Sequence, residues 1–151
     1  MQRIKYALAI IIIAVYGILS FQARERDVSS IEGAPPIELI DGIRITTFTV
    51  SSDHSYLSFR LAEEQVKAVK EILNDAKFKK RNYLNNEQSI YDSSISFSVD
   101  IMANKTAYKM TVYDNSMVEI DDKDTYFITD VNLISLLLEY TNEQIGYSKK
   151  E

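Results

Sequence analysis

Apolar and polar residues alternate along much of the chain between residues 37 and 145. The clearest case is residues 95–101, where Ile, Phe, Val and Ile take every second position and Ser or Asp the others. Successive side chains of a strand point to opposite faces, so this pattern predicts a strand with one buried face. Further segments of this kind predict strands over residues 43–50, 56–61, 106–113, 117–120 and 125–129.

Two segments instead repeat their apolar residues at a period close to that of an α-helix. Residues 62–76 place Val66, Val69 and Leu73 on one face, and residues 131–144 do the same with their leucines. The element order is ββ(β)-α-βββ(β)-α. It predicts an α+β domain in which an antiparallel sheet of about five to six strands carries two helices packed on it.

Turn residues suggest how these elements are connected. A short apolar run over residues 37–40 is followed by Asp41-Gly42, a dipeptide typical of tight hairpins, so a hairpin is expected there. Residues 78–93 are polar and rich in Asn, which predicts a long connection. Asn104-Lys105 predicts a further turn between two strands.

The N-terminal part of the chain differs from the rest. Residues 6–23 contain no charged side chain and follow Arg3 and Lys5. Eighteen helical residues would extend about 27 Å, close to the hydrocarbon core of about 30 Å. This predicts an N-terminal transmembrane helix and a single-pass protein of the cell membrane whose C-terminal domain is extracytoplasmic. The alternative is a secreted protein, cleaved near Ser20.

The predicted organisation has five parts. They are a basic N-terminal segment (1–5), the transmembrane anchor or uncleaved signal (6–23), a polar linker (24–36), the globular α+β domain (37–145) and a flexible tail (146–151).

Composition narrows the possible functions. The 151 residues carry a net charge of −5, and an acidic surface repels nucleic-acid phosphates, so no nucleic-acid partner is expected. The chain has no cysteine, which excludes disulfides, thiolate metal sites and a cysteine nucleophile.

No pattern of catalytic or ligand-binding residues is evident. His54 is the single histidine and lies beside Asp53 within a serine-rich turn, but neighbouring residues do not converge as a catalytic triad requires. Asp122 would begin a calcium loop, yet Phe127 and Leu133 occupy its sixth and twelfth positions. We therefore expect no cofactor, no metal and no enzyme activity.

Two groups of residues are candidates for an interaction surface. Lys77, Lys79, Lys80 and Arg81 form one basic cluster, which either caps the preceding helix or contacts an anionic lipid or wall polymer. The chain also has ten tyrosines, a residue common both on half-buried sheets and at interfaces, and Tyr108 and Tyr113 lie in the predicted meander.

Several features between residues 37 and 145 form one recognisable pattern. They are the alternating strand over 43–50, the AEEQVKAVKEIL helix, the long polar loop, the meander, and the Tyr-Phe-Ile-Thr strand before a Leu-rich helix. In this pattern residues 37–145 resemble the small, membrane-anchored extracytoplasmic domains of Gram-positive bacteria, many of them uncharacterised lipoproteins. The chain lacks the cysteine that carries lipid in such proteins. The resemblance implies an α+β fold and an extracytoplasmic location, but it does not point to any particular activity.

These observations predict a membrane-tethered binding or interaction module in the cell envelope. Its partners would be the membrane, through residues 6–23, and another envelope protein or a wall or lipid component. Envelope stress, sporulation and immunity to a secreted toxin are all compatible roles. An envelope enzyme with a carboxylate site and an accessory subunit of a membrane complex are the alternatives. A deep pocket with two converging carboxylates would favour the enzyme, and a flat or tyrosine-lined sheet face the binding module.

Overall fold

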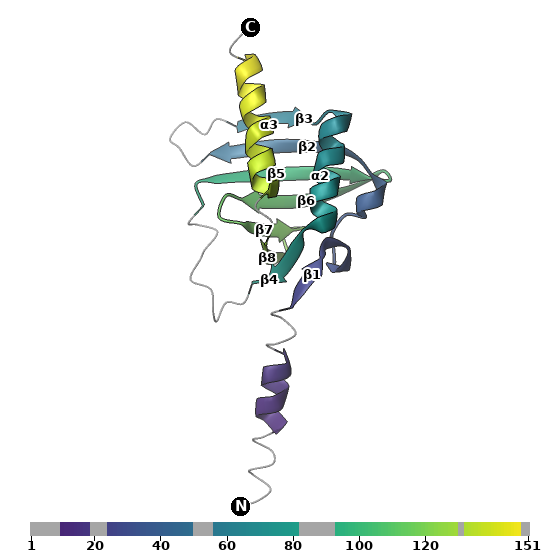
Figure 1. Cartoon of the computed structure of the whole chain (residues 1–151), viewed down its shortest axis with the longest axis vertical. Coiled ribbons are helices and arrows are strands. Elements are labelled where there is room, and N and C mark those ends of the chain that lie inside the picture. The colour runs from purple at the N-terminus through teal and green to yellow at the C-terminus, as the bar shows by residue number, and fades with distance from the viewer. Residues whose placement is uncertain (1–9, 19–23, 50–55, 82–92, 130–131, 149–151) are drawn as a thin grey trace, which may run out of the picture.

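A single antiparallel sheet organises the chain. The computed structural model describes residues 10–18, 24–49, 56–81, 93–129 and 132–148. Eight strands lie in the order β1-β4-β8-β7-β6-β5-β2-β3, and Figure 1 shows α2 and α3 across one face of this sheet. The bounds are β1 (Glu25–Asp27), β2 (Ile40–Thr49), β3 (Tyr56–Arg60), α2 (Glu63–Asp75), β4 (Lys77–Lys80), β5 (Ile95–Ala103), β6 (Thr106–Tyr113), β7 (Met117–Ile120), β8 (Asp124–Ile128) and α3 (Asn132–Ser148).

The α+β character is confirmed, but the predicted sheet of about five to six strands is wrong because the sheet has eight. The strands that the prediction omitted are β1 and β4, which lie in segments expected to be a linker and a polar connection. Each is too short for a period of two to be visible, and β1 contains no apolar residue. Backbone pairing places them in the sheet, since β4 joins β1 on one side and β8 on the other.

The hairpin expected at Asp41-Gly42 does not form. Residues Ile37–Leu39 are a short 3-10 helix, and Asp41-Gly42 lies inside β2. There the register against β5 shifts between Ile40 and Gly42, as in a β-bulge. The turn at Asn104-Lys105 is confirmed, and both residues have positive φ (48° and 66°), as a type I′ hairpin requires.

The predicted transmembrane helix over residues 6–23 is also wrong, and with it the single-pass membrane localisation. In the described part of the chain no helix is both long and apolar enough to cross a membrane. The described residues of the helix there, 10–18, extend about 13 Å at 1.5 Å per residue, against about 30 Å of hydrocarbon. The cleavage expected near Ser20 lies outside the described residues.

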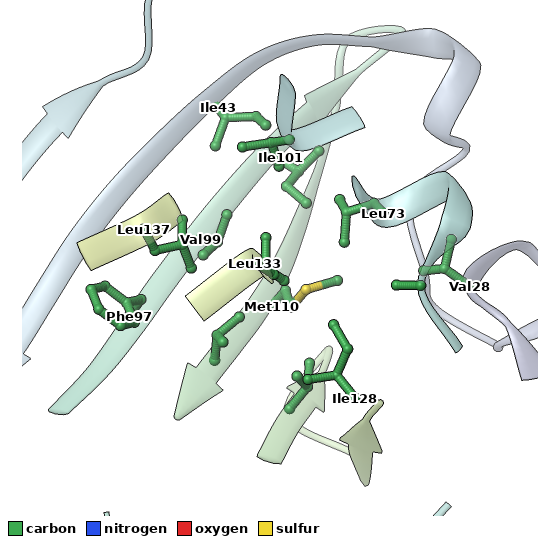
Figure 2. Close-up of a cluster of buried hydrophobic side chains, with 14 of the residues drawn as sticks. Val28, Ile43, Leu73, Phe97, Val99, Ile101, Met110, Ile128, Leu133 and Leu137 are labelled. Atoms are coloured by element: carbon green, nitrogen blue, oxygen red, sulfur yellow. The ribbon is translucent and has the colours of Figure 1, made fainter. Parts of the chain in front are cut away.

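The core lies between the sheet and its two helices. The apolar faces predicted for the helices are buried, with Leu73 of α2 and Leu137 of α3 at 1% and 0% exposure. Figure 2 shows these side chains meeting strand residues from β2, β5, β6 and β8. Val28, which precedes the predicted globular domain, belongs to the same cluster and is 1% exposed.

One polar contact also joins α3 to the sheet. Thr47 of β2 and Thr141 of α3 are both buried, and their hydroxyl oxygens lie 3.3 Å apart. The Thr141 hydroxyl donates to the Leu137 carbonyl at 2.8 Å. Because buried hydroxyls need partners, this pair satisfies both groups where α3 crosses β2.

Candidate functional site

Side chains of several strands gather on the face of the sheet opposite α2 and α3, which we call the open face. Strand alternation defines it: Ile43, Ile45 and Thr47 of β2 are buried under the helices, while Arg44 and Phe48 between and beside them are exposed. Register then assigns its central residues, which are Arg44, Thr46, Phe48, Ser58, Arg60, Ser96, Ser98, Asp100, Met102, Ala107, Lys109, Thr111, Tyr113 and Glu119.

Small hydroxyl side chains form one row across the open face. Ser58, Thr46, Ser98 and Thr111 are successive cross-strand partners from β3 to β6, and Glu119 of β7 ends the row. The hydroxyl oxygens of Thr46 and Ser58 hydrogen-bond at 3.1 Å. Short side chains in the middle of the face leave room for a partner to approach the sheet closely.

Charged side chains form the adjacent row. Arg60, Arg44, Asp100 and Lys109 are successive cross-strand partners on β3, β2, β5 and β6. Lys109 Nζ lies 2.9 Å from Asp122 Oδ2. Within the described part of the chain, neither arginine has a carboxylate within 4 Å.

A cavity of about 710 Å³ opens beside this row of charged side chains. Three cationic side chains, two acidic ones and several apolar or small residues line it. The lining residues are Asp41, Gly42, Ile43, Arg44, Arg60, Asp100, Met102, Lys105 and Ala107.

A larger cavity of about 850 Å³ lies on the other side of β2, at the start of α2. Glu63 and Glu64 line it together with Lys67 and Lys70. Adjacent helical residues lie about 100° apart around the helix axis, so Glu63 and Glu64 leave the helix in different directions. Lys70 Nζ donates to the backbone carbonyls of Glu38 and Ile40, at 3.2 Å each.

The basic cluster predicted from the sequence does not form one patch. Lys77, Lys79 and Lys80 lie on β4, where alternation places the first two on the side of the open face and Lys80 on the helix side. Lys77 forms an ion pair with Asp27, and hydrogen bonding to that carboxylate raises the lysine pKa. Arg81 follows the strand, half-buried, and its backbone N–H donates to the Thr125 carbonyl at 2.9 Å.

The two candidate tyrosines lie on opposite faces. Tyr108 pairs with Ile101 and is partly buried against the core under the helices. Tyr113 is on the open face, where its hydroxyl donates to Glu119 Oε2 at 2.8 Å. Only Tyr113 therefore contributes to the open face.

Lys80, Asp124 and Tyr126 form a cluster at the helix side of the sheet. Lys80 Nζ and the Tyr126 hydroxyl lie 2.8 Å and 3.4 Å from Asp124 Oδ2. Hydrogen bonding to Asp124 raises the pKa of Lys80, and burial raises the pKa of Tyr126 above its ordinary 10.0. Both groups hold their protons more strongly in the folded chain than in the unfolded chain.

This cluster predicts a loss of stability in alkaline solution. A raised folded-state pKa gives stabilisation that is complete below the unfolded pKa and is lost as the pH rises through the folded pKa. The thermal midpoint should therefore fall as the pH rises from about 9 to about 11. Tyr126→Phe, followed by thermal unfolding across this range, should give a shallower fall. An identical slope in both proteins would show that Tyr126 is not involved.

Other residues considered from the sequence show no shared site. Asp121, Asp122 and Asp124 each pair with a different lysine, Lys123, Lys109 and Lys80. No group of three or more His, Cys, Asp or Glu side chains suited to a metal ion occurs in the ranges described. His54 and Asp53 lie outside those ranges.

Comparison with known proteins adds no relative. No family model matches the chain, and neither the curated proteins nor the solved structures contain a match. The arginines of the open face were missed in the sequence, because alternation places each on an outer face but only strand register brings Arg44 opposite Arg60.

Proposed function

We propose that this protein is a non-catalytic binding module that recognises another protein through the open face of its sheet. The observation that carries the proposal is the one-sided packing of the sheet, with both α2 and α3 on one face (Figure 1). An antiparallel sheet with a solvated face normally alternates apolar and polar residues. Here the solvated side also exposes Phe48 (48%) and Met102 (39%) beside arginines and hydroxyls.

The dimensions of the open face support this use. Five neighbouring strands, β3, β2, β5, β6 and β7, cover about 19 Å at about 4.8 Å per spacing, and β6 is about 27 Å long. Width times length gives a flat area of about 500 Å², to which the protruding side chains add. This area is of the same order as the roughly 800 Å² that each partner buries in a standard protein interface.

The side chains on the open face are also suited to protein recognition. Aromatic residues, methionine and arginine are enriched at interfaces, and the face presents each of them. They are mounted on paired strands, so a partner meets a surface that is already ordered and little conformational entropy is lost on binding. Phe48 and Met102 supply apolar contact, while Arg44 and Arg60 supply charge complementarity.

Site-specific photocross-linking tests the proposal. A photoreactive phenylalanine analogue at Thr111 places the probe in the middle of the open face, and the same analogue at exposed Glu71 places it on the outside of α2. In cells that make the protein naturally, the Thr111 probe should give a discrete protein adduct that mass spectrometry can identify. Adducts of equal yield from both positions, or from neither, would contradict the assignment of the binding surface.

A further inference from the structure

Arg44 and Arg60 face each other directly on neighbouring strands of the open face. As cross-strand partners their Cβ atoms are about 5 Å apart, a distance at which like charges destabilise a sheet. Both residues are exposed, and neither forms an ion pair with any residue of the described ranges. Asp100 lies opposite Arg44 and offsets part of the repulsion, but Arg60 lies at the sheet edge with no acidic cross-strand partner.

A third cation at the same cavity is held in an unfavourable backbone conformation. Lys105 has φ of 66°, in the left-handed region that Gly, Asn and Asp occupy more readily. Glycine would relieve this strain, whereas lysine places an ammonium group on the rim of the cavity. Two separate features of this cavity, the arginine pair and the strained lysine, therefore lower stability and add positive charge.

The rest of the lining indicates what kind of ligand these cations suit. Three cations against Asp41 and Asp100 leave the lining with one net positive charge, and Met102 and Ala107 present apolar surface that a small free anion cannot use. A protein segment that carries a carboxylate beside an apolar side chain fits both parts of the lining. The chain as a whole has a net charge of −5, so an acidic partner would be repelled elsewhere on the surface.

We infer that the cavity binds an acidic segment of the protein partner, in which an Asp or Glu carboxylate accepts hydrogen bonds from Arg44 and Arg60 and a neighbouring apolar side chain packs on Met102. Guanidinium groups suit this role because their planar forks match carboxylate geometry. Lys105 adds positive charge at the rim. The inference rests on the proposed function and names the chemistry of the partner at one part of the open face.

Peptides of defined charge provide the test. The full chain is titrated with a short synthetic peptide of alternating leucine and glutamate, and with matched peptides that carry glutamine or lysine in place of glutamate. We expect the glutamate peptide to bind at least about tenfold more tightly than the glutamine peptide, with amide shifts around Arg44, Arg60 and Lys105. The Arg44→Glu, Arg60→Glu double variant should lose this preference and bind the lysine peptide instead. The matched control Lys67→Glu, an exposed charge reversal on α2, should leave the affinity within about twofold.

Two variants separate loss of binding from loss of folding. Arg44→Thr removes the like-charge pair and Lys105→Gly removes the unfavourable φ. Each variant should therefore raise the thermal midpoint and lower the affinity for the glutamate peptide. Equal affinity for the glutamate and glutamine peptides would overturn the inference. Displacement of the glutamate peptide by inorganic phosphate at an equal concentration of negative charge would overturn it as well.

The failure of this inference is distinct from the failure of the proposed function. If the Thr111 probe still cross-links a partner in the Arg44→Glu, Arg60→Glu background, the open face binds a protein but this cavity does not hold its acidic segment. If the Thr111 probe gives no adduct in the chain that keeps both arginines, the proposed function itself is wrong.

Discussion

Replacing Phe97 by alanine is expected to lower the free energy of unfolding by about 3–5 kcal/mol. Phe97 lies in β5 on the helix-covered side and is 0% exposed. Its ring fills space between the sheet and α3 (Figure 2), so truncation removes buried apolar surface and leaves a cavity. Urea unfolding of both proteins measures the difference, provided that the free energy of unfolding depends on urea concentration with the same slope in both.

Phe48→Ala is the matched control for this experiment. Phe48 lies on β2, paired with Ser96 next to the Thr47–Phe97 pair, but it points to the open face and is 48% exposed. Its replacement should change the free energy of unfolding by less than about 1 kcal/mol. Similar losses for the two phenylalanines would mean that both faces of β2 and β5 are covered, which would remove the basis for the proposed function.

Replacing Val28 by aspartate is expected to lower the free energy of unfolding by about 3 kcal/mol or more. Val28 follows β1 and is 1% exposed within the main hydrophobic cluster (Figure 2). An aspartate there would lose its hydration without gaining a cationic partner in the apolar core. Thermal or urea unfolding of the full chain measures the effect.

Ser29→Asp is the matched control, because it introduces the same charge at the neighbouring exposed position. It should change the free energy of unfolding by no more than about 0.5 kcal/mol. If Val28→Asp were as stable as Ser29→Asp, the residues before 37 would behave as the polar linker that the sequence suggests. The burial of Val28 and Ile31 (5% exposed) instead makes them part of the folded domain.

The candidate site illustrates why local pattern was not enough. The sequence drew attention to consecutive cations, but consecutive strand residues alternate between faces, so Lys79 and Lys80 point in opposite directions. Arg44 and Arg60 are separated in the sequence and stand in ordinary amphipathic strands. Their meeting depends on the register of β2 against β3, which no local signal specifies.

The sequence by itself determined the α+β class, the long central strands and both helices with their buried faces. Those elements have many residues, so the period of their apolar positions is visible and burial of that face is the main driving force. Tertiary structure alone decided the short strands β1 and β4, the β-bulge at Gly42, the inclusion of Val28 in the core and the placement of both α2 and α3 on one side of the sheet. These features depend on backbone pairing and on register between distant segments, and such pairings leave no periodic trace in the chain.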